Sequence, residues 1–105
     1  MAGEYGKRLS VPDTSGNMSA TAARLETSET AIRRYVSVKP IGSTTVYMWP
    51  SATTATAADV VANGWPLDES QLSLQPSHQD EALDLSRYWF ATASGAGAGE
   101  VVAIG

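Results

Sequence analysis

Residues 87–93, Arg-Tyr-Trp-Phe-Ala-Thr-Ala, form the stretch with the strongest β-strand tendency in this 105-residue chain. Aromatic and β-branched side chains are enriched in strands, and the stretch contains neither glycine nor proline. Another strand is predicted at Glu100–Ile104 (EVVAI), beyond the segment Ser94–Gly99 (SGAGAG). Because a glycine-rich connection permits a tight reversal of the chain, we expect these two strands to form a hairpin.

Two more strands are predicted in the first half of the chain. They are Arg34–Val38 (RYVSV), stopped by Lys39-Pro40, and Thr44–Trp49 (TTVYMW), stopped by Pro50. The short segment Ile41–Ser43 between them is typical of a turn. The pattern therefore predicts another hairpin.

A single short helix is predicted within residues 51–64. Thr56 is a suitable N-cap, Asp59 follows three residues later near the positive end of the helix, and Gly64 ends it. The next segments are predicted to be a bend (65–69), a short strand (71–75) and a polar, acidic loop (76–84). Short strands separated by glycine and proline turns indicate an all-β fold, a small antiparallel β-sandwich or jelly-roll-like barrel.

The first 30 residues differ in composition from the rest of the chain. They are rich in Ser, Thr, Ala and Gly, and their few large apolar residues are too scattered for a helical stripe or a strand alternation. Such a segment buries too little surface to offset its ordering entropy. We therefore expect an extended or flexible N-terminal arm (1–30) and a β-sandwich body (31–105). The candidate docking residues of the arm are Tyr5, Lys7, Arg8, Leu9, Val11 and Arg24.

Charge is unevenly distributed along the chain. Residues 1–39 hold six basic and four acidic residues, a net of +2, whereas residues 40–105 hold one basic and seven acidic residues, a net of −6. A mildly basic segment suits docking on an acidic protein surface, although an ordinary solvated charge distribution explains the pattern equally well. No basic cluster is interleaved with aromatic residues, so we expect no nucleic-acid partner.

The size and residue types of the chain limit how it is stabilised and where it works. A 105-residue domain without cysteine has no disulfide to support its small core, so partner subunits are the expected support. No apolar run approaches the roughly 20 residues that span a bilayer, and no secretion signal is recognisable. We therefore expect synthesis in a cytoplasm and no membrane partner.

Residue patterns of catalytic and metal sites are scarce. The single histidine, His78, has Asp80, Glu81 and Asp84 nearby, but one histidine without cysteine favours a solvated acidic loop over a metal site. No serine has a nucleophile-elbow motif, and the spacing of Gly95, Gly97 and Gly99 favours a flexible turn over a dinucleotide site. We therefore expect no enzyme activity, no cofactor and no metal.

Aromatic residues are numerous for so small a body. The predicted strands place Tyr88 and Phe90 on one face and Trp89 on the other, so both faces need cover. Some rings would cap the ends of the sandwich, and others would contact another subunit, because Trp and Tyr are enriched at interface hot spots. Glycan binding is a third option. The candidate interface residues are Tyr47, Trp49, Trp65, Tyr88, Trp89 and Phe90.

Several short motifs follow one another in a familiar order. They are Thr45–Pro50 (TVYMWP), Ala62–Leu67 (ANGWPL), Leu72–Leu74 (LSL), Tyr88–Gly95 (YWFATASG) and Val101–Ile104 (VVAI). In this order the chain resembles a group of small tailed-bacteriophage virion structural proteins over about residues 34–104. It departs from that group at Met48–Pro50, where the usual glycine is absent, and in a longer insertion at 51–62.

The resemblance implies a role and a set of partners. It implies a β-sandwich of the capsid decoration, cement or head-fibre-base type, assembled in the host bacterial cytoplasm and located on the virion. The partners that it implies are further copies of the chain, as a homo-oligomer and specifically a trimer, and the major capsid protein or another virion protein. A neck or tail adaptor, a fibre component and a glycan- or receptor-binding module are the alternatives.

Overall fold

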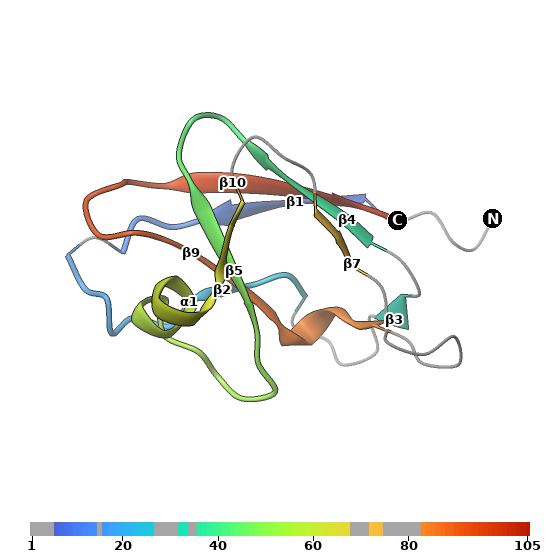
Figure 1. Cartoon of the computed structure of the whole chain (residues 1–105), viewed down its shortest axis with the longest axis horizontal. Coiled ribbons are helices and arrows are strands. Elements are labelled where there is room, and N and C mark those ends of the chain that lie inside the picture. Colours follow the sequence, from blue (N-terminus) through green and yellow to red (C-terminus); the bar gives the residue numbers. More distant parts are fainter. Residues whose placement is uncertain (1–5, 15, 27–31, 34–35, 68–71, 75–82) are drawn as a thin grey trace.

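The computed structural model describes residues 6–14, 16–26, 32–33, 36–67, 72–74 and 83–105, and these form an all-β sandwich (Figure 1). The first sheet has the strand order β1 (Gly6–Val11), β10 (Gly99–Ile104), β4 (Val36–Ile41), β7 (Leu72–Leu74). The second has the order β2 (Ala23–Arg24), β9 (Tyr88–Thr92), β5 (Val46–Pro50), β6 (Trp65–Leu67). The strand pairs of both sheets are antiparallel, as predicted.

Four smaller elements complete the described part of the chain. Strands β3 (Ile32–Arg33) and β8 (Leu83–Asp84) pair with each other in a short ribbon. A 3-10 turn, η1 (Leu85–Arg87), leads into β9, and helix α1 (Ala57–Asn63) connects β5 to β6. Figure 1 shows α1 lying beside β5 and β9.

The core lies between the two sheets and follows the alternation of the strands. Val36 and Val38 face inward from β4, and Met48 and Phe90 face them from β5 and β9. All four side chains are fully buried, and each contributes roughly 1.5–3 kcal/mol by leaving water. The other buried members of the cluster are Val11, Leu25, Val46, Leu67, Leu85, Val101 and Ala103.

The two predicted hairpins are both wrong, because each pair of consecutive strands is divided between the two sheets. Strand β4 belongs to the first sheet and β5 to the second, and β9 and β10 are separated in the same way. The connections do reverse the chain, and Gly42 (φ 89°) and Gly97 (φ 87°) supply the left-handed conformations that these turns require. Turn residues predict a reversal, but they do not determine whether the flanking strands pair with each other or face each other across a core.

Two prolines lie inside strands that the sequence predicted to stop or bend there. Strand β4 continues through Pro40 to Ile41, and Pro66 lies in β6 where a bend was expected. Proline is tolerated where a strand lacks a neighbour on one side. Pro66 satisfies this condition because β6 is an edge strand, whereas the residues that follow the β4–β7 register opposite Pro40 lie outside the described part of the chain.

The N-terminal segment also differs from its expected form. Strand β1 pairs with β10 over all six of its residues, and Val11 and Leu25 are buried in the core, so residues 6–26 are part of the sandwich, apart from the undescribed Ser15. Leu9 and Val11 share a face, since they are two residues apart. The remaining stabilisation comes from backbone hydrogen bonds to β10, which composition does not reveal. Residues 1–5, including Tyr5, and residues 27–31 lie outside the described residues.

Candidate docking surface on the second sheet

Three side chains form a row across the outer face of the second sheet, and the ring of a fourth residue, on the edge strand, meets the end of that row. We call Arg24 (β2), Trp89 (β9), Trp49 (β5) and Trp65 (β6) the aromatic row. Arg24 pairs with Trp89, and Trp89 pairs with Trp49, so these three share one face of the sheet. The Trp65 ring extends the row from the edge strand, with its centroid 6.4 Å from that of Trp49.

Trp89 is the buried centre of the row. Its side chain is only 4% exposed, and its indole Nε1 donates a hydrogen bond to the carbonyl oxygen of Ser51 at 3.0 Å. The guanidinium carbon of Arg24 lies 5.1 Å from the ring centroid, within the range of a cation–π contact. Ser51 is itself held by a 2.7 Å hydrogen bond from its N–H to the carbonyl of Arg87. The chain after Pro50 therefore covers Trp89 and satisfies its polar atom.

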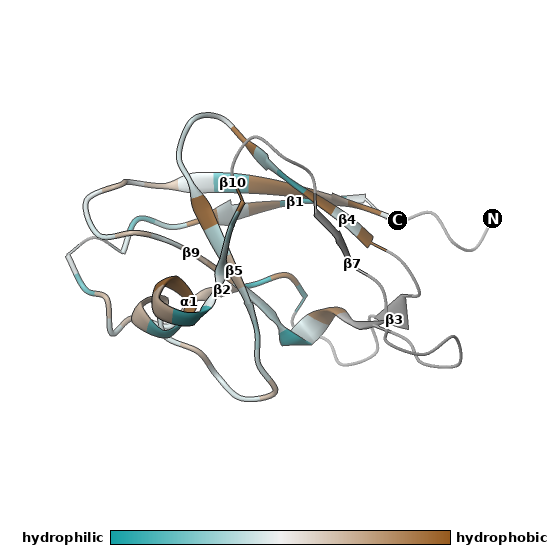
Figure 2. Cartoon of the chain, viewed as in Figure 1, coloured by the Kyte–Doolittle hydropathy of each residue, from teal (hydrophilic) through white to brown (hydrophobic). Residues whose placement is uncertain are grey.

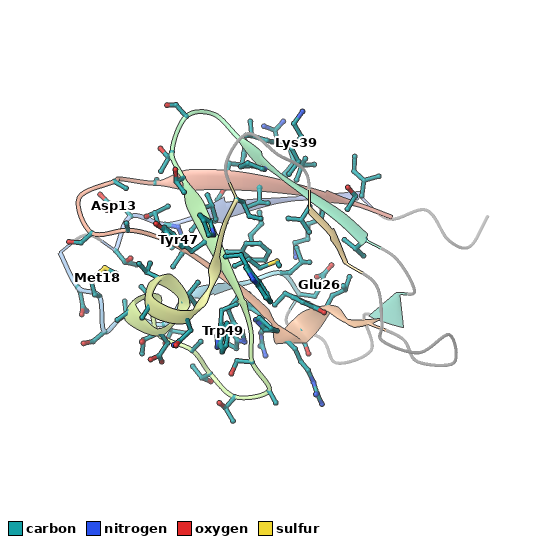
Figure 3. All side chains as sticks on the ribbon, in the orientation of Figure 1. Asp13, Met18, Glu26, Lys39, Tyr47 and Trp49 are labelled. Carbon is teal, nitrogen blue, oxygen red and sulfur yellow. The ribbon has the colours of Figure 1, made fainter. Side chains whose placement is uncertain are left out.

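Trp49 and Trp65 form the open end of the row. Their ring planes are tilted by 45°, Trp49 is half-buried, and Trp65 is 52% exposed. In Figure 3, Tyr47 and Trp49 extend from β5 on the side of the molecule opposite Lys39. Trp65 and Ile104 are the exposed large hydrophobic residues of the described part of the chain, and Trp65 also contacts another aromatic ring, that of Trp49.

Helix α1 covers the neighbouring half of the same face. Ala57 and Val60 are fully buried and pack in one cluster with Ala22, Ala91 and Trp89. Figure 2 shows that the helix carries both apolar and polar residues, as expected when one side is buried. The outer face of the second sheet thus has a half covered by its own chain and an aromatic end that is open.

The predicted caps of the helix are confirmed. The Thr56 hydroxyl accepts from the N–H of Asp59, and the Asp59 carboxylate accepts from the N–H of Thr56, both at 3.2 Å, which forms a capping box. The N–H groups of Ala57 and Ala58 donate to the carbonyls of Ala20 and Met18 at 2.9 Å. The N-terminal segment therefore fixes the start of the helix.

Gly64 positions Trp65 at the exit from the helix. A Cβ atom at residue 64 would lie 2.4 Å from the carbonyl oxygen of Val60 and 2.5 Å from that of Met48. Only glycine fits between these two backbone groups without displacing one of them. The residue is needed for close approach and not for a left-handed conformation, since its φ is −84°.

The remaining predicted interface residues have different positions. Phe90 is fully buried between the sheets and Tyr88 packs against the same core, so Phe90 has no surface to offer a second subunit. Tyr47 is half-buried beside α1. The sequence prediction that Trp89 lies on the face opposite Tyr88 and Phe90 is confirmed. Trp89 is covered by other residues of its own chain, among them Ser51 and Val60, and the sequence pattern does not predict this cover.

The arm candidates are divided between both sheets. Lys7, Arg8, Leu9 and Val11 lie in β1, whereas Arg24 belongs to the aromatic row. The role of Arg24 was missed by the sequence analysis, because the pairing of β2 with β9 brings together residues 65 positions apart. No local signal in the sequence indicates that pairing.

The described residues contain no group of three His, Asp or Glu side chains that could hold a metal ion. Residues 76–82 of the predicted acidic loop, with His78, Asp80 and Glu81, lie outside the described residues, whereas Leu83 and Asp84 form strand β8 and not a loop as predicted. No helix in the described part of the chain is long and apolar enough to cross a membrane.

Comparison with known proteins identified no relative of this chain. No protein-family model matches the chain, and no curated protein or solved structure matches it.

Proposed function

We propose that this chain is a non-enzymatic structural protein of a bacteriophage particle that docks on the major capsid protein through the open end of the aromatic row. The observation that supports the docking surface is the pair of tilted rings Trp49–Trp65, with Trp65 52% exposed beside a face that the chain otherwise covers itself. The assignment to a phage particle rests on the ordered motifs between residues 34 and 104. Self-association of the chain on the particle is part of the proposal.

The exposed area of this pair is large enough to contribute to docking. A tryptophan buries up to about 250 Å², so covering the exposed half of Trp65 stabilises a complex by about 3 kcal/mol. Tryptophan is among the residues that most often dominate protein interfaces, especially where neighbouring groups exclude water. Trp49 and the covered Trp89 would supply that rigid support beneath Trp65.

The surroundings of the pair favour a protein partner over a glycan. Glycan sites combine aromatic rings with polar groups that are free to bind hydroxyls. Here the Trp89 N–H is engaged by Ser51, and the Asn63 side-chain amide, next to Gly64, donates to the carbonyl of Asp59 at 3.0 Å. The rings of Trp49 and Trp65 are also tilted by 45° and do not form one flat platform.

The copy number of the chain in purified particles tests the proposal. Quantitative mass spectrometry of particles from the phage genome that encodes the chain should find hundreds of copies, in proportion to the major capsid protein. Six or twelve copies per particle would contradict docking on the capsid and would indicate a neck or tail adaptor. Absence of the chain from purified particles would overturn the assignment to a virion.

A further inference from the structure

Among the described strands, β1 forms an edge of the first sheet over its full length. It lies at the end of the first sheet, and among the described strands it pairs only with β10. With six residues it is much longer than the edge strands of the second sheet, β2 and β6, which have two and three. A long edge strand is a template for pairing with another chain unless something prevents it.

Charged side chains on an edge strand usually prevent its pairing with another chain, but this effect is weakened on β1. Its two cations are both paired within the chain: Lys7 Nζ lies 2.9 Å from Glu26 Oε1, and an Arg8 guanidinium nitrogen lies 2.6 Å from Glu100 Oε1. The hydrogen bond from Arg8 to Glu100, with the attraction of that carboxylate, raises the pKa of Arg8. The edge therefore carries side chains whose charges are already compensated.

We infer that β1 pairs antiparallel with β1 of a second copy of this chain, about a two-fold axis at Leu9. An antiparallel pair of identical strands is related by an axis perpendicular to the sheet, so one residue lies opposite itself and the inner faces of both copies stay on the same side. The two four-stranded sheets would then join into one continuous sheet of eight strands.

The register follows from the residues of β1. An axis at Arg8 would place two guanidinium groups opposite each other, and an axis at Lys7 or Ser10 would leave only three residues of the strand paired. A two-fold axis at Leu9 pairs residues 7–11 of the two copies and places their Leu9 residues opposite each other. It also places Lys7 opposite Val11, and Arg8 opposite Ser10, of the second copy.

Packing and charge agree with this register. Leu9 is half-buried at the margin of the core, so a second leucine opposite it would cover apolar surface that the single chain leaves exposed. Within each copy, Ser10 pairs with Glu100 of β10. Because Arg8 would lie opposite Ser10 of the second copy, its positive charge would lie near the Glu100 carboxylate of that copy. Like charges do not meet anywhere in the five paired positions.

This inference does not depend on the proposed docking surface, because β1 and the aromatic row lie in different sheets. It predicts a dimer, in place of the trimer implied by the resemblance. The two proposals fail separately, since docking is tested on particles and pairing on the purified chain alone.

Single cysteines test the register, because the natural chain has none. We expect Leu9→Cys to form a disulfide-linked dimer on mild oxidation at low protein concentration. Ser10→Cys, at a more exposed position of the same strand, is the matched control. In the proposed register the two copies of residue 10 lie about 8 Å apart, beyond the roughly 7 Å that a disulfide tolerates. Equal cross-linking of both variants, or none of Leu9→Cys, would overturn the register.

A second variant and a mass measurement test the pairing independently if Leu9→Cys does not fold. The double variant R8C/S10C keeps Leu9 and should also cross-link, because the register places residue 8 opposite residue 10 of the second copy. Light scattering of the natural chain should give twice the monomer mass of 11.0 kDa. A monomer or a trimer at all concentrations would contradict the two-fold pairing.

Discussion

Trp49 and Trp89 lie directly opposite each other on β5 and β9, yet only Trp89 is covered by its own chain. The difference arises from the segment after Pro50, which passes over Trp89 and accepts its indole N–H at Ser51, while Trp49 faces Trp65 at the sheet edge. Two equivalent aromatic positions in one sheet therefore have different roles. Trp89 stabilises the fold, and we propose that the pair Trp49–Trp65 contacts a partner.

Substitution of the covered and the exposed tryptophan separates these roles. Trp89→Ala should lower the free energy of unfolding by about 3–5 kcal/mol, because it removes a buried side chain and leaves a cavity. Trp65→Ala should lower it by about 1 kcal/mol or less, since the residue is half exposed and its aromatic contact is the tilted one with Trp49. Urea denaturation followed by circular dichroism measures both. Equal losses would contradict the assignment of Trp89 to the fold.

Gly64 should tolerate no larger side chain. Gly64→Ala places a Cβ atom against the carbonyl oxygens of Val60 and Met48, so we expect a loss of about 1–3 kcal/mol in the free energy of unfolding. Gly16→Ala is the matched control, because a Cβ there meets nothing within 4 Å. Denaturant midpoints of the two variants should differ clearly. A midpoint of Gly64→Ala equal to that of the natural chain would show that the turn into β6 is not constrained as described.

The capping box should contribute measurably to stability. Thr56→Ala removes the side chain that accepts from Asp59 N–H, and the expected cost is about 1 kcal/mol. Thr54→Ala, at an exposed threonine two residues earlier, should change stability by less than about 0.5 kcal/mol. Thermal unfolding at matched protein concentration compares them. The capping role would be refuted by equal unfolding temperatures.

Deletion of the N-terminal segment should affect folding before it affects docking. Removing residues 1–11 deletes β1 and takes Val11 from the core, so we expect a loss of at least about 2 kcal/mol. Removing residues 1–5 leaves every described strand intact and is the control. Hydrogen exchange of β10 amides should increase only in the longer deletion. Unchanged exchange there would mean that β1 is a dispensable arm after all.

The sequence was sufficient to locate elements but not to pair them. Strands β9 and β10 and the caps Thr56 and Gly64 were predicted within a residue or two, because strand tendency and helix caps are local properties. The alternation along residues 88–90 correctly placed Tyr88 and Phe90 on the face opposite Trp89. Local patterns of this kind follow directly from the geometry of the strand.

Pairing between distant residues was not predictable in the same way. Strand β1 is held by backbone hydrogen bonds to the other end of the chain, so its polar composition suggested an arm. The two hairpins were predicted because glycine turns are equally compatible with strands that face each other across a core. Arg24 reaches the aromatic row only through the pairing of β2 with β9. Each of these features depends on a contact that a single sequence does not reveal.

The docking claim is tested most directly by binding of the purified chain to phage particles that lack it. Trp65→Ala should weaken particle binding at least tenfold, about 1.4 kcal/mol or more, while the free energy of unfolding changes little. Ile104→Ala removes a comparably exposed hydrophobic residue from the other sheet and should bind as the natural chain does. Equal affinity of the natural chain and Trp65→Ala would contradict docking through the aromatic row.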